Sequence, residues 1–165
     1  MTLFYTGVGS RKTPPAILHL MRLLADKLAS MGYTLRSGGA EGADSAFEDG
    51  ATAKEIYRPE DATPMALKMA AAVHPKWGYC SGYAKRLHAR NCFQVLGREL
   101  DTPSCMLICW TPDGATCAAE CTFVPGGVST GGTATAIRLA ELHDVPVRNL
   151  ARPDHYAAAM RFLNS

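Results

Sequence analysis

Thr34-Leu-Arg-Ser-Gly-Gly-Ala-Glu-Gly-Ala-Asp-Ser-Ala-Phe-Glu-Asp-Gly-Ala51 is the stretch that decides the fold. It begins as a short extended run, turns on Ser37, Gly38 and Gly39, and continues from about Gly42 as a helix of small residues. Glycine permits a positive φ and leaves backbone N–H groups accessible, and a helix N-terminus carries a partial positive charge. The stretch therefore predicts a strand-to-helix turn that cradles an anionic group, most often a phosphate.

Two further glycine-rich turns of the same kind occur at residues 7–15 and 126–135. A single turn of this type is weak evidence, whereas three at strand-to-helix junctions favour one common site. We therefore predict nucleotide binding. The sequence leaves open which nucleotide is bound and whether it is cleaved.

Strand-like and helix-like segments alternate along the whole chain, which is typical of an α/β fold. The fold class we predict is a single doubly wound, mostly parallel Rossmann-like sheet with helices on both faces. It forms one domain over residues 1–165, with the ligand at the carboxyl edge. Residues 115–124 are ambiguous, with a hairpin excursion as one interpretation. Strands are expected at residues 3–8, 33–36, 54–57, 104–110 and 145–150, and helices near residues 17–31, 42–51, 65–73, 83–100, 134–142 and 154–162.

The composition is that of a globular chain, with 47% hydrophobic and 19% charged residues. The formal net charge of +2 is too small to indicate a strongly basic nucleic-acid surface. No apolar run reaches the roughly 20 residues of a membrane helix, and residues 1–9 enter a strand pattern without a leader. We expect a cytoplasmic protein with no membrane partner, and the small charge disfavours a nucleic-acid partner.

Six cysteines are present without any C-x-x-C pair, and a reducing cytosol disfavours disulfides. We expect free, mostly buried thiols, with no metal and no cofactor. His88 and Cys92 lie four residues apart, as do Cys117 and Cys121, so a structural zinc site is the alternative.

Candidate ligand contacts follow the first predicted strand, where Gly9, Ser10 and Arg11 place a hydroxyl and a guanidinium beside the turn. Arginine matches phosphate oxygens bidentately, although a solvated turn arginine is the alternative. On the helix at 83–100, Arg90 and Asn91 either contact the ligand or face water.

Glu41 and Asp44 would repel a phosphate beside the opening turn. They suit ribose hydroxyls or a base edge, or they are ordinary carboxylates of a helix N-terminus. Trp110 ends the predicted strand at 104–110 and is a candidate for stacking on a base, or else a core residue.

The third turn offers backbone N–H groups and three hydroxyls directly before a helix. This pattern predicts a phosphate cradle, and a plain glycine-rich turn with a capping threonine is the alternative. No Walker lysine follows, which disfavours ordinary ATPase chemistry. The residues concerned are Ser129, Thr130, Gly131, Gly132 and Thr133.

These motifs occur in the same order in the Rossmann-like SLOG superfamily, which the chain resembles over residues 3–149. That superfamily joins the DNA-processing protein A family, the Lonely Guy phosphoribohydrolases and sensors of nucleotide-derived signals. The turn at residues 37–44 looks like the glycine turn of the DNA-processing family. Residues 88–91 are similar to the Lonely Guy Met-His-x-Arg-Lys segment, which implies that Arg90 contacts a phosphoribosyl group.

The Lonely Guy motif Pro-Gly-Gly-x-Gly-Thr-x-x-Glu aligns with residues 130–138, so Arg138 stands where that family keeps its catalytic glutamate. An arginine can neither attack the sugar nor stabilise oxocarbenium-like charge. The resemblance therefore implies binding more than hydrolysis. Glu41, Asp44 and Glu120 are the carboxylates that remain as substitutes.

Three functions follow from these observations. The first is a sensor or sequestering protein for a nucleotide or nucleotide-derived signal, ADP-ribose-like or cyclic, for example in a conflict between phage and host. The second is a nucleoside 5'-monophosphate N-glycosidase, and the third is single-stranded DNA binding, which the modest charge disfavours. The superfamily is often dimeric, so a homo-oligomer is an expectation of the resemblance.

Overall fold

A computed structural model describes all 165 residues and contains one five-stranded, entirely parallel sheet. Its strand order, β3-β2-β1-β4-β5, confirms the doubly wound Rossmann-like class predicted from the sequence. The strands are β1 (Leu3–Gly7), β2 (Tyr33–Ser37), β3 (Lys54–Ile56), β4 (Leu107–Cys109) and β5 (Val147–Asn149).

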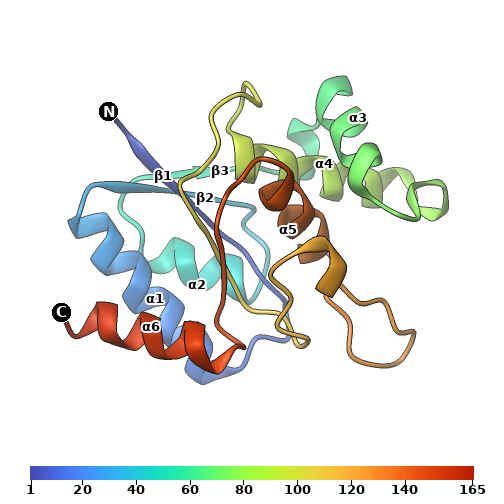
Figure 1. The fold of residues 1–165 in the computed structure, drawn as a ribbon. Helices are drawn as coiled ribbons and strands as arrows, with labels where there is room; N and C mark the ends of the chain where they lie inside the picture. The colour runs from blue at the N-terminus through green and yellow to red at the C-terminus, as the bar shows by residue number, and fades with distance from the viewer.

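Helices cover both faces of the sheet, as Figure 1 shows. Helices α1, α2 and α6 pack on one face, and α3, α4 and α5 on the other. The helices are α1 (Pro15–Ser30), α2 (Ala43–Gly50), α3 (Pro64–Val73), α4 (Gly82–Leu96), α5 (Thr133–Leu142) and α6 (Pro153–Leu163), with short 3-10 turns η1 (Pro59–Asp61), η2 (Trp77–Tyr79) and η3 (Ala118–Glu120).

Two hydrophobic clusters lie on opposite sides of the sheet, and β4 contributes to both. Leu107 and Cys109 point into the cluster under α3, α4 and α5, whereas Ile108 points into the cluster under α1, α2 and α6. Successive side chains of a strand face opposite sides, so a strand between two helical layers must be apolar on both. This explains the continuous apolar run of the sequence.

The structure corrects two details of the sequence prediction. The strand predicted at residues 104–110 is regular only over β4, although Cys105 N still donates to Phe4 O at 2.8 Å. Residues 115–124, for which a hairpin was one interpretation, contain the short turn η3 and no strand.

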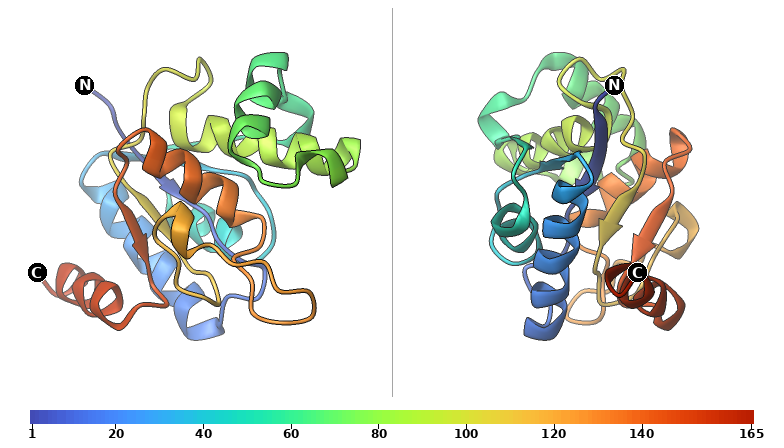
Figure 2. Two further views of the ribbon diagram at one scale, coloured as in Figure 1. Left: turned by 45° about the vertical axis from the view of Figure 1, so that its right-hand side comes forward. Right: turned by 90° about the vertical axis from the view of Figure 1, so that its left-hand side faces the viewer.

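The order of the strands fixes where a ligand can bind. The chain leaves β1 toward β2 on one side and reaches β4 on the other, so the sheet changes direction between β1 and β4. Loops that leave these two strands diverge and open a crevice at their carboxyl ends. The left view of Figure 2 shows the loop before α5 extending from the body of the molecule. None of the helices combines the length and the apolar character needed to cross a membrane.

Candidate functional site

A cavity of about 540 Å³ opens at the carboxyl ends of β1 and β4, at the crevice where the strand order reverses. Its walls come from the loop after β1, the start of α2, the inner face of α4 and the turn before α5. The residues that line it are 8–12, Ala40, Asp44, Ala84, Leu87, His88, Arg90, Asn91, Gln94, Pro112 and 127–133.

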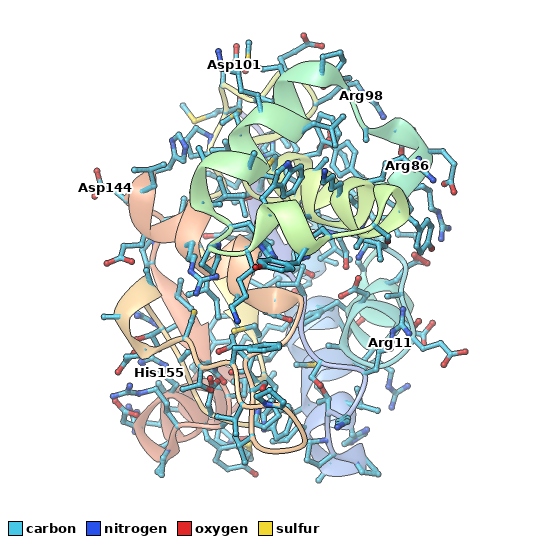
Figure 3. The ribbon with its side chains drawn as sticks, turned by 90° about the vertical axis from the view of Figure 1, so that its right-hand side faces the viewer. Arg11, Arg86, Arg98, Asp101, Asp144 and His155 are labelled. Carbon is cyan, nitrogen blue, oxygen red and sulfur yellow. The ribbon has the colours of Figure 1, made fainter.

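The loop after β1 packs directly against the N-terminus of α2, and glycines allow the contact. A Cβ on Gly9 would lie 2.8 Å from Ala43 Cβ, and one on Gly42 would lie 2.9 Å from Arg11 Cα. Both glycines also have a positive φ. The contact holds Arg11 at the rim of the cavity. In Figure 3, Arg11 lies below the ribbon of α4 and next to the ribbon of α2.

The turn before α5 leaves the helix N-terminus open to the cavity. Gly131 has a φ of 73°, and no atom lies within 4 Å of a Cβ built on Gly131 or on Gly132. No side chain caps α5. Asn91 Nδ2 donates to Gly132 O at 3.1 Å and so fixes the turn against α4. Ala134 N donates to Gly131 O at 3.1 Å, whereas Thr133, the first residue of α5, lines the cavity. The open N-terminus of α5 therefore adjoins a space that an anion can fill.

Arg90 extends from α4 into the floor of the cavity. Its Nη1 donates to Gly38 O at 3.2 Å, whereas its buried Nε has no partner. Burial lowers the pKa of Arg90, and the neighbouring Asp44 carboxyl acts against that effect. An arginine remains charged under such a shift, so Arg90 brings a partly unsatisfied cation to the floor.

Gln94, one turn along α4 from Arg90, is fully buried and lines the same cavity. Neither its Oε1 nor its Nε2 has a hydrogen-bond partner. A buried amide without partners is costly, which makes Gln94 a group that a polar ligand can satisfy.

Asp44 supplies the only carboxylate among the residues that line the cavity. Its side chain is 3% exposed, and its Oδ2 accepts from Ala40 N at 3.3 Å. Burial raises the pKa of Asp44 to about 6, although the charge of Arg90 acts in the opposite direction. Asp44 therefore changes charge near neutral pH inside the cavity.

Asp113 holds the loop that forms the outer wall. Thr111 and Thr122 donate hydroxyl hydrogen bonds of 2.8 Å to its carboxylate, and the Thr130 hydroxyl donates a third bond. Burial alone would raise the pKa of Asp113, but these hydroxyls lower it below its usual value. Asp113 was not predicted from the sequence, because its partners lie up to 17 residues away along the chain.

Eleven of the predicted site residues line this one cavity, and five do not. The eleven are Gly9, Ser10, Arg11, Asp44, Arg90, Asn91, Ser129, Thr130, Gly131, Gly132 and Thr133. Lys12, His88 and Gln94 also line it and were not singled out as ligand contacts. Lys12 adjoins the predicted Gly9–Arg11 turn, and Gln94 lies one helical turn beyond Arg90. Both could therefore have been predicted as cavity residues from their spacing to residues already chosen.

The five other predicted residues lie behind the cavity or outside it. Ser37 is buried and donates to Gly7 O at 2.6 Å, and Gly38 accepts from Arg90. A Cβ on Gly39 would lie 2.6 Å from Arg58 Nη1, so that guanidinium covers the turn. Glu41 is exposed, and Trp110 packs with the core under α1, α2 and α6.

Glu120, the third carboxylate considered from sequence, and Arg138 also lie outside the cavity. Glu120 Oε1 accepts from the Thr116 N–H and hydroxyl, and Glu120 Oε2 pairs with Arg152 at 3.4 Å. Arg138 lines a separate shallow hollow together with Glu141.

A group of potential metal ligands adjoins the cavity and was not predicted. One ligand atom each from His74, Cys80 and His88 lie within 4.8 Å of one another. Cys92, four residues beyond His88, instead donates to Ala66 O at 3.4 Å in the core. All six cysteines have free thiols.

Comparisons of the chain with protein-family models, with curated proteins and with solved structures find no match.

Proposed function

We propose that this protein binds a nucleotide or a nucleotide-derived signalling molecule in the cavity between β1 and β4, with a phosphate group at the N-terminus of α5. The observation that carries the proposal is the convergence of three separate segments on one space. These are the loop with Arg11, the open turn Gly131–Thr133 and the α4 side chain of Arg90. Donors that converge on one cavity of a parallel sheet suit an anionic ligand.

Size and charge support the proposal. A volume of about 540 Å³ falls within the usual range for small-molecule sites. Three cationic side chains, Arg11, Lys12 and Arg90, line the cavity against the single carboxyl of Asp44. The unpartnered amide of Gln94 and the Asp44 carboxyl provide groups for a ribose or a base edge at the buried end. A sensor or a sequestering protein of the kind suggested by the SLOG resemblance fits this arrangement.

Binding without turnover is favoured because the cavity contains a single carboxyl group, that of Asp44, and none from the residue that aligns with the Lonely Guy glutamate. Arg138, at the position where the Lonely Guy motif has its glutamate, lies outside the cavity. The alternative is hydrolysis of a nucleoside 5'-monophosphate, and one observation favours it. The buried Asp44, with a pKa near 6, has the properties of a general acid. Release of free base from a nucleotide panel, abolished in Asp44→Asn, would establish the alternative.

The binding proposal is tested by a thermal-shift and native mass spectrometry panel of nucleoside monophosphates, ADP-ribose and cyclic dinucleotides. We expect at least one of them to bind and raise the unfolding temperature. Charge-assisted hydrogen bonds contribute about 1.5–3 kcal/mol, so Arg11→Ala and Arg90→Ala should each weaken binding at least about 10-fold.

Arg86→Ala is the matched control, because it removes the same charge from α4 at a position that does not line the cavity. Urea unfolding of each variant separates loss of a contact from loss of the fold. Affinity that stays unchanged in both Arg11→Ala and Arg90→Ala would show that the ligand binds elsewhere.

A further inference from the structure

His74, Cys80 and His88 are brought together where α3 turns back onto α4. His74 is the C-cap residue that follows α3 and Cys80 follows the turn η2, while His88 lies in the second turn of α4. His74 Nε2 and Cys80 Sγ are 3.8 Å apart, and the two imidazole centroids are 4.3 Å apart. All three residues are partly buried, and Trp77 packs beside both rings.

The spacing of the His74 and Cys80 ligand atoms agrees with tetrahedral coordination, whereas the widest spacing in the group, up to 4.8 Å, must close when a metal binds. Zinc–nitrogen bonds of about 2.0–2.1 Å and zinc–sulfur bonds of about 2.3 Å place a nitrogen and a sulfur ligand about 3.6 Å apart. The observed 3.8 Å between His74 Nε2 and Cys80 Sγ requires almost no movement to reach that value. Imidazole and thiolate together are the ligands that zinc prefers.

The His88 ring is already oriented by a neighbouring helix. Its Nδ1 lies 2.8 Å from the Thr135 hydroxyl of α5, so Nε2 is the nitrogen available to a metal. An outer hydrogen bond of this kind fixes the ring and the tautomer of a metal-binding histidine. Burial lowers the pKa of both histidines, which keeps the rings neutral, as ligands must be.

We propose that His74, Cys80 and His88 form a zinc site with three protein ligands, in which the fourth position is taken by water or by an anion. The site joins the α3–α4 connection to α4 and, through Thr135, to the start of α5. It does not depend on nucleotide binding, although His88 also lines the cavity.

Binding requires two proton movements. The Cys80 thiol loses its proton to solvent when the sulfur–zinc bond forms. His74 Nδ1 now accepts from Lys76 N at 3.1 Å, which places the ring proton on Nε2. Coordination through Nε2 moves that proton to Nδ1 and breaks the bond to Lys76. That backbone N–H is exposed, so water can replace the lost partner.

Two cations oppose the metal, because the charge of Arg138 acts on both imidazoles and the charge of Arg90 acts on His88. The Cys80 thiolate offsets one charge of the zinc ion. A net positive site next to Arg138 favours an anion in the fourth position.

The test is a titration of the full, chelator-treated chain with Co²⁺ in a phosphine reductant, followed by displacement with Zn²⁺. We expect one equivalent of Co²⁺ to give the visible bands of tetrahedral cobalt and a thiolate-to-cobalt charge-transfer band. Loss of an outer-shell partner already weakens metal affinity about 10–100-fold, so Cys80→Ser should abolish the charge-transfer band and weaken affinity at least about 100-fold.

Cys117→Ser is the matched control, because that thiol is equally half-buried but lies outside the group. His74→Gln is a second variant that should lose the tetrahedral spectrum, and far-ultraviolet circular dichroism without metal checks that each variant folds. In the wild-type chain, long-range ¹H–¹⁵N spectra should show the His74 proton moving from Nε2 to Nδ1 on addition of Zn²⁺. A charge-transfer band that persists in Cys80→Ser, or a stoichiometric titration of the wild-type chain that yields none, overturns the proposal.

Discussion

The turns before α2 and α5 are alike in sequence but opposite in surroundings. The turn before α2 is filled by the protein itself. A Cβ on Gly38 would lie 2.2 Å from Gln94 Nε2, and the Asp44 carboxylate accepts from Ala40 N. At the turn before α5, positions Gly131 and Gly132 are open and the first turn of the helix contains no acidic residue.

This difference separates a turn that organises the site from a turn that can receive a ligand. Asp44 already supplies the negative charge that favours a helix N-terminus, so α2 has little capacity left for a phosphate. The N-terminus of α5 has no such internal partner. A glycine-rich turn predicts an anion site only when no carboxylate of the chain occupies it.

The largest expected effect comes from making the α5 turn resemble the α2 turn. Gly132→Asp places a carboxylate at the open N-terminus, where it competes with the ligand phosphate for the same N–H groups. We expect affinity for the strongest nucleotide of the panel to fall about 100-fold, which corresponds to about 2.7 kcal/mol. Isothermal titration calorimetry measures the change.

Gly132→Asn is the control for that substitution, because it has the same shape without the charge. We expect Gly132→Asn to lose clearly less affinity than Gly132→Asp. Equal losses would mean that crowding, rather than charge, is responsible, and that the phosphate lies elsewhere.

The second prediction compares the packing of the two turns through their stability. Gly38→Ala forces a Cβ against the fully buried Gln94 and to within 2.9 Å of Arg90 Cζ, so a packed group must move. Overpacking of this kind costs about 1–3 kcal/mol, and we expect a loss of about 2 kcal/mol in the free energy of unfolding.

Gly132→Ala is the matched substitution at the other turn. Gly132 has helical φ and ψ angles and open space around its Cβ position, so its free energy of unfolding should stay within about 0.5 kcal/mol of the wild-type value. Urea unfolding measures the free energy of unfolding of both variants, and we expect its dependence on urea concentration (the m-value) to stay unchanged. Similar losses at the two positions would contradict the contrast between a filled and an open turn.

The alternation of strands and helices was predictable because hydrophobic periodicity is local. Features that depend on distant partners were not. The bond from Arg90 to Gly38 O joins residues 52 positions apart, and it is this contact that fills the α2 turn. The sequence did carry one signal, since Asp44 beside a supposed phosphate site was a conflict of charge. His74, Cys80 and His88 have no recognisable metal spacing, because they meet only where α3 folds against α4.

The smallest predicted effect concerns the protonation of Asp44. Its pKa is about 6 in the folded chain, compared with 3.8 as the ordinary value, so the folded state holds this proton more tightly. Stability contributed by the neutral form is therefore lost as pH rises from about 4 to about 6, and the loss is complete above that range. Asp44→Asn mimics the neutral form. It should match the wild-type free energy of unfolding near pH 4 and exceed it by about 1–2 kcal/mol at pH 7.5.

The charge of Asp44 should also make ligand affinity depend on pH. An ionised Asp44 opposes an anion in the cavity, so affinity should rise as pH falls from 7.5 to 5.5 and lose this dependence in Asp44→Asn. ADP-ribose, if the panel shows that it binds, is the suitable probe, because phosphodiester groups do not titrate in this range whereas a terminal phosphate has a pKa near 6. Glu41→Gln, in the same turn but exposed, controls for the loss of one negative charge. A pH dependence that survives in Asp44→Asn would assign the titration to the ligand or to another group and would leave Asp44 with a structural role only.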